Sequence, residues 1–325
     1  MNNLKKVGLS ALAGSMVAFS AQAMEMSVSG TAKITYVDEG EGSAGNTDVT
    51  GNPYGFDQTI GFNGSGDSPI GTISLMHVAN TNGSRSSSII KIDMGDAGTI
   101  SLDGGVGNSG AGTIKDMMPR AAGQEQAWDD TDGDAYFIDT PSQGAWGYDN
   151  NLAGFDVSIG YAKNGGGNAQ DDGNIDAGSE SSRSIAVKNS GMVEGVSFGF
   201  GMSEVDSASS TTTVDSTTAY VTYSMGPVTI GAQDTSIDNP LGTADADSMM
   251  YGISFNINEN ASIAYNQRDV DISGTGVDQE DTGIGASYTM GSASIRILNA
   301  ETSNLAGSST AKDVEHTEIS LMLAF

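Results

Sequence analysis

Residues 196–202 read Val-Ser-Phe-Gly-Phe-Gly-Met, so that an apolar residue alternates with a small or polar one. This two-residue period is typical of a strand whose two faces meet different surroundings. The same period returns in residues 28–36, 155–161, 219–225, 249–257, 261–265, 284–290 and 319–325. Apolar residues at helical spacing occur nowhere over a comparable length, so the sequence predicts an all-β chain.

The connections between these strands predict how the strands are joined. Short turns, such as residues 226–227 and 291–292, alternate with longer segments rich in Gly, Ser, Thr and Asp. The longer segments are centred near residues 45, 83, 125, 172, 209, 241, 275 and 306. Seven short turns and eight long loops connect sixteen strands of about ten residues, a length that suits a tilted crossing of a bilayer. The pattern predicts a 16-stranded antiparallel transmembrane β-barrel with short periplasmic turns and long extracellular loops.

Closure of the sheet explains the lean composition. Only 37% of the residues are hydrophobic and 6% aromatic, which is little for a water-soluble core in a chain of 325 residues. In hydrocarbon every backbone N–H and C=O has to be paired within the protein, and a closed sheet has no free edge. The apolar side chains then face lipid and no large dry core is needed. A soluble β-sandwich would also alternate, but it rarely pairs short and long connections so regularly.

Charge and cysteine content exclude several classes of protein. The 41 acidic residues against 13 Lys plus Arg give a formal charge of −28 and a pI near 4.1. Binding to nucleic acid requires clustered cations and is therefore excluded. The absence of cysteine excludes disulfide scaffolds, thiolate metal sites and a cysteine nucleophile. The chain past the N-terminus also lacks an apolar run of about 18 residues, which excludes a bundle of membrane helices.

The N-terminus has the three parts of a secretory signal peptide. Lys5 and Lys6 precede an apolar stretch of small residues from Val7 to Phe19, and Ala21-Gln22-Ala23 fits the A-x-A cleavage pattern. We expect residues 1–23 to be a cleaved signal peptide and residues 24–325 to form the barrel domain. A short buried helix is the alternative for the first segment. The signal predicts export from the cytoplasm.

The C-terminus carries the sharpest short motif. In the final stretch, Ile319 to Phe325, apolar residues alternate and the last residue of the chain is aromatic. With the signal peptide, the strand count and the long third loop, this ending resembles the general porins of Gram-negative outer membranes. The length and the Gly/Asp-rich turns are most similar to the short porins typified by those of Rhodobacter.

The resemblance implies a location and partners. It implies a bacterial outer-membrane protein, reached through the periplasm and surrounded by lipid bilayer and lipopolysaccharide. It also implies a homotrimer, and that Phe325 is part of the signal read by the outer-membrane assembly machinery. Independently of the resemblance, Phe325 can simply be the end of a lipid-facing strand.

The third loop is the candidate constriction. A structureless stretch as long as residues 107–144 is usually functional, and in the family that the chain resembles this loop folds into the barrel. The enteric branch of that family has a Pro-Glu-Phe-Gly-Gly motif here, which this chain lacks. The loop carries an excess of carboxylates, at Asp116, Glu125, Asp129, Asp130, Asp132, Asp134 and Asp139. An acidic surface loop is the alternative.

Strand parity predicts a basic cluster on the lumen wall. Charged groups on the lipid face cost about 2–4 kcal/mol at mid-depth, so the strand cations should face inward. These are Lys33, Lys91, Lys188, Arg268 and Arg296. Opposed to an acidic third loop, they would set a transverse field across the channel, as the resemblance implies. Alternatively, they only balance lumenal carboxylates such as Asp93, Asp103, Asp156 and Glu318.

One acidic turn has the spacing of a calcium ligand set. Asp130, Asp132 and Asp134 present carboxylates at alternate positions, which suits Ca²⁺, although the remainder of a helix-loop-helix site is absent. An ordinary solvated acidic turn is the alternative. No cofactor is expected to be required.

The sequence therefore predicts a water-filled channel for passive diffusion of small hydrophilic solutes and ions. Because carboxylates prevail, we expect cations to be preferred. The alternatives are a substrate-selective porin for one class of small solute and a surface adhesin barrel. An enzyme is not expected, since a serine hydrolase needs a His base and the chain has only His77 and His316.

Overall fold

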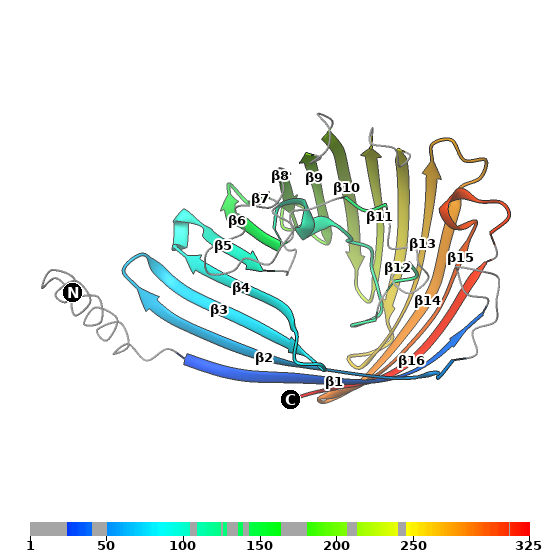
Figure 1. Ribbon diagram of the computed structural model, residues 1–325, viewed down its shortest axis with the longest axis horizontal. Coiled ribbons are helices and arrows are strands. Elements are labelled where there is room, and N and C mark those ends of the chain that lie inside the picture. Colours follow the sequence, from blue (N-terminus) through cyan, green and yellow to red (C-terminus); the bar gives the residue numbers. More distant parts are fainter. Residues whose placement is uncertain are drawn as a thin grey trace, which may run out of the picture.

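The computed structural model describes residues 25–40, 51–104, 109–124, 126–128, 136–138, 143–163, 181–206, 213–239, 245–311 and 313–325. Within these residues sixteen antiparallel strands form one closed barrel, in which each strand pairs with its neighbours in sequence and β1 pairs with β16 (Figure 1). The predicted 16-stranded barrel is confirmed. The strands are β1 (Glu25–Glu39), β2 (Tyr54–Ser68), β3 (Gly71–Asn80), β4 (Arg85–Asp93), β5 (Thr99–Gly104), β6 (Gln143–Leu152), β7 (Phe155–Lys163), β8 (Ser181–Asn189), β9 (Val196–Asp206), β10 (Thr213–Met225), β11 (Val228–Asp238), β12 (Ala246–Asn256), β13 (Ala261–Ile272), β14 (Gln279–Met290), β15 (Ala293–Ser303) and β16 (Val314–Ala324).

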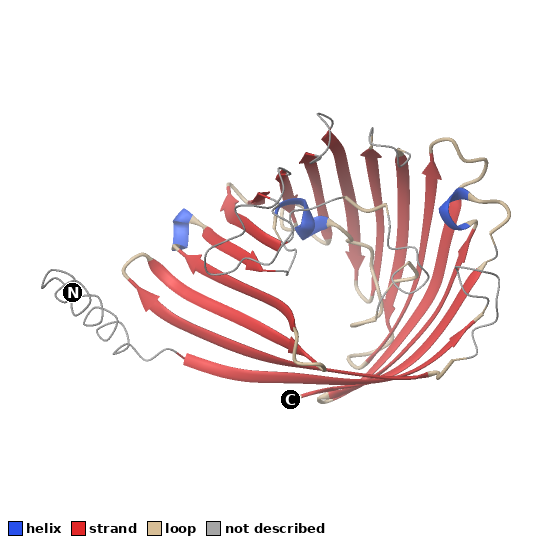
Figure 2. Ribbon diagram, viewed as in Figure 1, coloured by secondary structure: helices blue, strands red, loops and turns tan. Residues whose placement is uncertain are grey.

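Helical structure is minor (Figure 2). In the described residues it consists of the short 3₁₀ helices η1 (Gly95–Ala97), η2 (Gly110–Ile114) and η3 (Leu305–Gly307). None of the described helices is both long and apolar enough to cross a membrane. The predicted signal peptide, residues 1–23, lies outside the described residues.

Side chains alternate between an apolar outer face and a polar inner face. On β9, Phe200 and Met202 are 48% and 45% exposed, whereas the alternate residues Gly201 and Ser203 are buried. The same alternation places Ile263 and Tyr265 of β13 on the outer face and Asn266 on the inner face. The apolar side of the sheet therefore faces outward, as expected of a barrel in lipid.

The outer face differs between its two ends. Near the short turns, outward positions carry aromatic side chains, among them Phe155, Tyr223, Phe255, Tyr288 and Phe325. Near the long loops, outward positions carry carboxylates, among them Glu204, Asp215, Asp247, Asp271, Glu280, Glu301 and Glu315. The apolar band thus begins at the short-turn end and gives way to charge at the long-loop end.

Connection lengths follow the predicted alternation only in part, since six residues join β8 to β9, where a short turn is predicted, and also β9 to β10, where a long loop is predicted. Pairs such as β10 and β11 are joined at one end by two residues, and β5 and β6 are joined at the other end by the long third loop. The composition near residue 83 predicts a long loop, but only residues 81–84 separate β3 from β4. There Gly83 N donates to Asn80 O over 2.8 Å, which closes a tight turn.

The barrel closes on its last residue. Phe325 N donates to Gly30 O over 3.0 Å, and Gly30 N donates to Phe325 O over 2.8 Å. The Phe325 ring lies over Gly30, where a β-carbon would overlap a ring carbon, so any larger residue at position 30 would displace the ring. The terminal aromatic residue therefore completes the pairing of β1 with β16.

Candidate channel constriction

The described part of the third loop lies inside the barrel (Figures 1 and 2). It follows β5 and begins with η2, which contacts the inner faces of β7, β8, β9 and β10. Met118 and Pro119 then pass over β11 and β12, and Ala127 reaches β14. The contacts of the described loop residues therefore run along one side of the barrel.

Polar side chains of the wall bind the main chain of the loop. The wall residues are small or amide side chains at inward positions of their strands, where they replace the hydrogen bonds that a loop would otherwise make to water. The bonds run from Gly110 N to Ser158 Oγ (2.9 Å), from Ala111 N to Ser184 Oγ (3.1 Å), from Ala122 N to Ser262 Oγ (2.8 Å) and from Asn266 Nδ2 to Pro119 O (2.7 Å).

Gln233 of β11 makes the densest set of these bonds. Its Nε2 donates to Ile114 O and to Lys115 O, each over 3.0 Å, and its Oε1 accepts from Met117 N over 2.9 Å. The side chain is 1% exposed. One wall residue therefore holds both sides of the bend that follows η2.

We expect Gln233→Leu to loosen this bend. The substitution leaves the Met117 N–H and two loop carbonyls without their partner, and a buried group left unpaired costs about 1–3 kcal/mol. The free energy of unfolding in detergent or lipid should fall by that amount. Gln58→Leu, on the exposed outer face of β2, is the matched control and should leave it within about 0.5 kcal/mol. Equal effects of the two substitutions would contradict the assignment.

Glycines on the inner wall make room for the loop. A β-carbon at Gly231 or Gly252 would lie 2.8 Å from Pro119 Cδ, and one at Gly283 would lie 2.7 Å from Ala127 Cβ. Real β-carbons essentially never lie so close to another atom. Gly201 beneath η2 and Gly285 beneath Gln124 have the same role. The glycines form a groove in which the loop lies flat against the sheet.

A buried ion pair stands beneath the far part of the loop. Arg268 of β13 donates through Nε to Asp281 Oδ2 of β14 over 2.8 Å, and both side chains are 0% exposed. The guanidinium carbon lies 5.5 Å from the ring centre of Trp128 and 5.0 Å from that of Phe137, which is cation–π distance. Two aromatic residues of the loop thus cover the ion pair.

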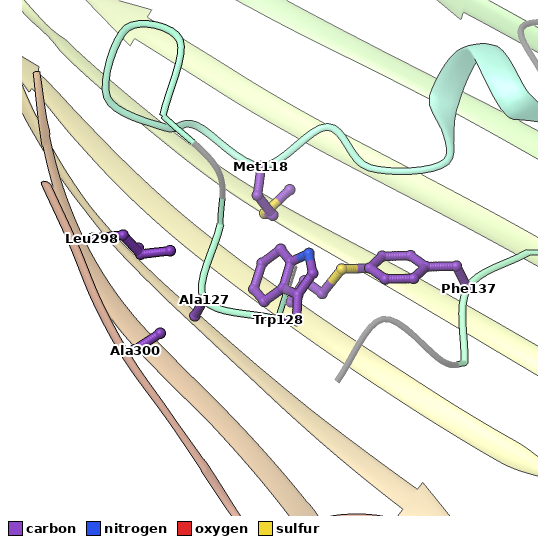
Figure 3. Close-up of a cluster of buried hydrophobic side chains, with 7 residues drawn as sticks. Met118, Ala127, Trp128, Phe137, Leu298 and Ala300 are labelled. Atoms are coloured by element: carbon purple, nitrogen blue, oxygen red, sulfur yellow. The ribbon is translucent and has the colours of Figure 1, made fainter. Parts of the chain in front are cut away.

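Apolar packing completes this anchor (Figure 3). Figure 3 shows Trp128 and Phe137 side by side, with Met118 beside them and the wall residues Leu298 and Ala300 nearby. The ring centres of Trp128 and Phe137 are 6.3 Å apart in a tilted arrangement. We call Arg268, Asp281, Trp128 and Phe137 the aromatic anchor.

The position of Arg268 corrects its predicted role. The alternation predicts that its side chain lines the water-filled lumen together with the other strand cations. The side chain does point inward, but the loop covers it and Asp281 neutralises it. Arg268 therefore contributes no surface to the lumen, because the loop lies between it and the solvent.

Asp116 is the one predicted loop carboxylate that the described residues include. It accepts from Trp128 Nε1 over 3.1 Å and from Met118 N over 3.2 Å, so it points toward the anchor. Burial raises the pKa of its carboxyl, against the lowering effects of these two hydrogen bonds and of Arg120 and Arg268. The other predicted acids, Glu125, Asp129, Asp130, Asp132, Asp134 and Asp139, lie outside the described residues.

The candidate calcium ligands Asp130, Asp132 and Asp134 are among those acids. Those three residues lie outside the described part of the chain. Among the residues that the structure does describe, no group of three or more His, Asp or Glu side chains could hold a metal ion. The exposed charges that the described loop presents are those of Lys115 and Arg120.

The remaining wall cations point inward on both sides of the barrel. Lys33 Nζ of β1 lies 2.8 Å from Glu318 Oε1 of β16. Lys91 of β4 is exposed and makes no ion pair with any described residue. On the loop side, Lys188 shares a cavity with Asp149 and Asp156.

Arg296 of β15 approaches the loop itself. Its guanidinium lies so close to Gly123 that a β-carbon there would be 2.5 Å from an Arg296 nitrogen. Gly123 has a φ of +71°, which favours glycine for a second reason. Arg296 therefore lies against the loop at Gly123.

The two histidines lie on opposite faces of the sheet. His77 of β3 is exposed on the outer face, where it lies opposite Phe62. His316 of β16 points inward, with Nδ1 3.4 Å from a Glu39 carboxylate oxygen. The sheet therefore separates the two rings.

The residues that bind the loop were not predicted individually. A detectable signal was available, since many inward positions of β7 to β14 carry Gly, Ser, Asn or Gln, whereas inward positions of β4 carry Lys91 and Asp93. A wall of small and amide residues indicates a second layer of chain, whereas a charged wall indicates water.

Comparisons with known proteins agree with this architecture. The profile of the family described as Gram-negative porin matches residues 8–307. No curated protein matches the chain. Among solved structures, the anion-selective porin from Comamonas acidovorans has a TM-score of 0.65 at 14% identity, covering 93% of this chain and 100% of its own.

Two further structures show the same fold. An engineered variant of the Rh. blastica porin has a TM-score of 0.62 at 13% identity, covering 93% of this chain and 100% of its own. OprB of Pseudomonas putida has a TM-score of 0.65 at 9% identity, covering 97% of each chain. At these identities the likeness concerns the fold, and the family assignment rests on the profile match. The chain belongs to the Gram-negative porin family, whose members reside in the outer membrane.

Proposed function

We propose that the barrel is a general diffusion channel for small hydrophilic solutes and ions. The observation that carries the proposal is that the described part of the third loop is bound to one side of the barrel wall. Its described contacts named above fall on strands from β7 to β15, whereas inner positions of β1 to β4 carry hydroxyl, amide and charged side chains such as Thr31, Asn63 and Lys91. A loop held to one wall leaves a polar passage along the other.

The proposed constriction lies between the loop and that opposite wall. Lys33, Lys91, Lys188 and Arg296 supply its positive side, together with Lys115 and Arg120 of the loop. We propose that the loop acids Glu125, Asp129, Asp130, Asp132, Asp134 and Asp139 supply the negative side. Such a field orders water, so that apolar solutes lose hydration without compensation and hydrophilic solutes pass.

We propose that the channel prefers cations. In the described strands, inward carboxylates outnumber inward cations once the covered pair of Arg268 and Asp281 is set aside. The carboxylates are Glu25, Glu39, Asp57, Asp67, Asp93, Asp103, Asp149, Asp156 and Glu318, and the cations are Lys33, Lys91, Lys188 and Arg296. The anion-selective relative from Comamonas acidovorans shares the fold, so the charges and not the fold must decide ion preference.

The reversal potential in a salt gradient tests this preference. We expect the sign that denotes cation permeation, with the largest value at low salt, because the Debye length is about 10 Å at 0.1 M and grows on dilution. A reversal potential of the opposite sign would reject cation preference but leave the channel intact. Conductance that is large and ohmic supports a general pore, and absence of conductance would favour the adhesin.

The outer face supports the proposed membrane arrangement. Its apolar band would contact lipid, and its carboxylate-rich end would face the lipopolysaccharide side, which places the long loops outside the cell. We further propose a homotrimer, and recognition of the strand ending in Phe325 by the assembly machinery. Both proposals follow from membership of the family.

A further inference from the structure

One row of residues crosses the inner wall of the first four strands. Register pairs Glu25 of β1 with Ser65 of β2, Ser65 with Ser74 of β3, and Ser74 with Lys91 of β4. All four residues occupy inward positions. The row therefore has a carboxylate at one end, an ammonium group at the other and two hydroxyls between them.

The two charged ends are too far apart to neutralise each other. Three strand spacings separate their main chains, or about 14 Å. Neither Glu25 nor Lys91 makes an ion pair or hydrogen bond through its side chain with any of the described residues. This differs from Lys33, which is held by Glu318 on the same side of the barrel. The row thus offers two opposite charges to whatever enters the lumen.

A cavity lies over this row. Its volume is about 700 Å³, and its lining includes the whole row together with Ser27, Asn63, Met76 and Ile89. Met76 and Ile89 face each other in register, next to the row on the same inner face. With Val78, the next inward residue of β3, they form an apolar patch in a wall that is mostly polar. Such a patch contributes nothing to the passage of water and ions. It can, however, bind the apolar part of an amphiphilic solute.

We propose that this cavity is a subsite for short zwitterionic peptides of about three residues. The peptide amine would pair with Glu25 and the peptide carboxylate with Lys91, while Ser65, Ser74 and Asn63 would bind its amides. An extended tripeptide spans about 10 Å, which the Glu25 and Lys91 side chains can bridge from the ends of the row. An apolar central side chain would cover Met76 and Ile89. The inference rests on the proposed function, since the peptide reaches this wall only through the channel.

The test is a single-channel measurement with alanyl-leucyl-alanine as the probe. We expect the free tripeptide to produce blockages of the potassium chloride current, and the N-acetylated, C-amidated tripeptide to produce far fewer. Lys91→Gln and Glu25→Gln should each weaken association roughly tenfold, the scale of one charge-assisted hydrogen bond. Lys163→Gln and Glu301→Gln, on the outer face of β7 and β15, are matched controls and should leave the blockages unchanged.

The outcomes separate this proposal from the proposed function. Equal blockage by free and capped peptide, or unchanged association in both inner-wall variants, would overturn the subsite while the potassium chloride current still demonstrates a channel. Absence of that current would overturn the proposed function instead. Met76→Ser provides an independent check, because it should weaken association of alanyl-leucyl-alanine more than that of triglycine.

Discussion

Replacing Arg268 by methionine should cost the barrel about 3–5 kcal/mol in free energy of unfolding, because it leaves the buried Asp281 carboxylate without a counter-charge. The same substitution removes the cation beneath Trp128 and Phe137. We therefore expect the third loop to lose its fixed position, which should appear as a noisier single-channel current. Urea titration in detergent micelles and planar-bilayer recording measure the two effects.

Two further variants make this result decisive. Arg183→Met breaks an ion pair with Glu204 on the exposed outer face of β8 and β9, so it should cost at most about 1 kcal/mol. The double variant Arg268→Met with Asp281→Leu removes both buried charges and should recover most of the lost stability. If Arg268→Met behaved like Arg183→Met, the aromatic anchor would not hold the loop.

Placing valine at Gly252 should lift the loop from its groove. The new β-carbon would lie 2.8 Å from Pro119 Cδ and 2.9 Å from Asn266 Nδ2, the amide that donates to Pro119 O. Overpacking of this kind costs about 1–3 kcal/mol. Because the displaced loop can move only toward the lumen, we expect a smaller single-channel conductance as well.

Gly61→Val is the matched control for this effect. Gly61 also lies on the inner wall, in β2, but the three nearest atoms to a β-carbon there belong to Ser29 and Asn63 of the wall, the closest being Ser29 Oγ at 3.0 Å. Valine favours extended backbone, so the barrel should keep its stability at this position. Equal loss of stability at the two positions would show that any inner-wall side chain is harmful, and that the groove is not specific to the loop.

The sequence was sufficient to predict the architecture because the barrel depends on local patterns. A two-residue period such as that of residues 196–202 decides which side chains meet lipid, and the lengths of the connections decide how strands follow one another. The segment near residue 83 was assigned wrongly because composition does not report length: Asn80 to Ser84 is polar and glycine-containing, yet a tight turn is made of the same residues.

The candidate site was less accessible to prediction because it depends on contacts between distant segments. The alternation along β13 correctly predicts that the Arg268 side chain points inward. It does not predict that Trp128 and Phe137 cover the guanidinium. The partners of Gln233 are about 118 residues away in the chain. Such pairs are determined by the path of the loop through the barrel, and the local patterns of a single sequence do not predict that path.

The bonds between Gly30 and Phe325 also bear on how the protein matures. They connect the first and last strands, so this contact has one of the greatest sequence separations among the described residues and a high entropic cost of formation. Before β1 meets β16 the sheet has two unpaired edges, which lipid does not tolerate. Closure of the barrel and entry into the bilayer should therefore be coupled, because the pairing of β1 with β16 removes the last unpaired edges of the sheet.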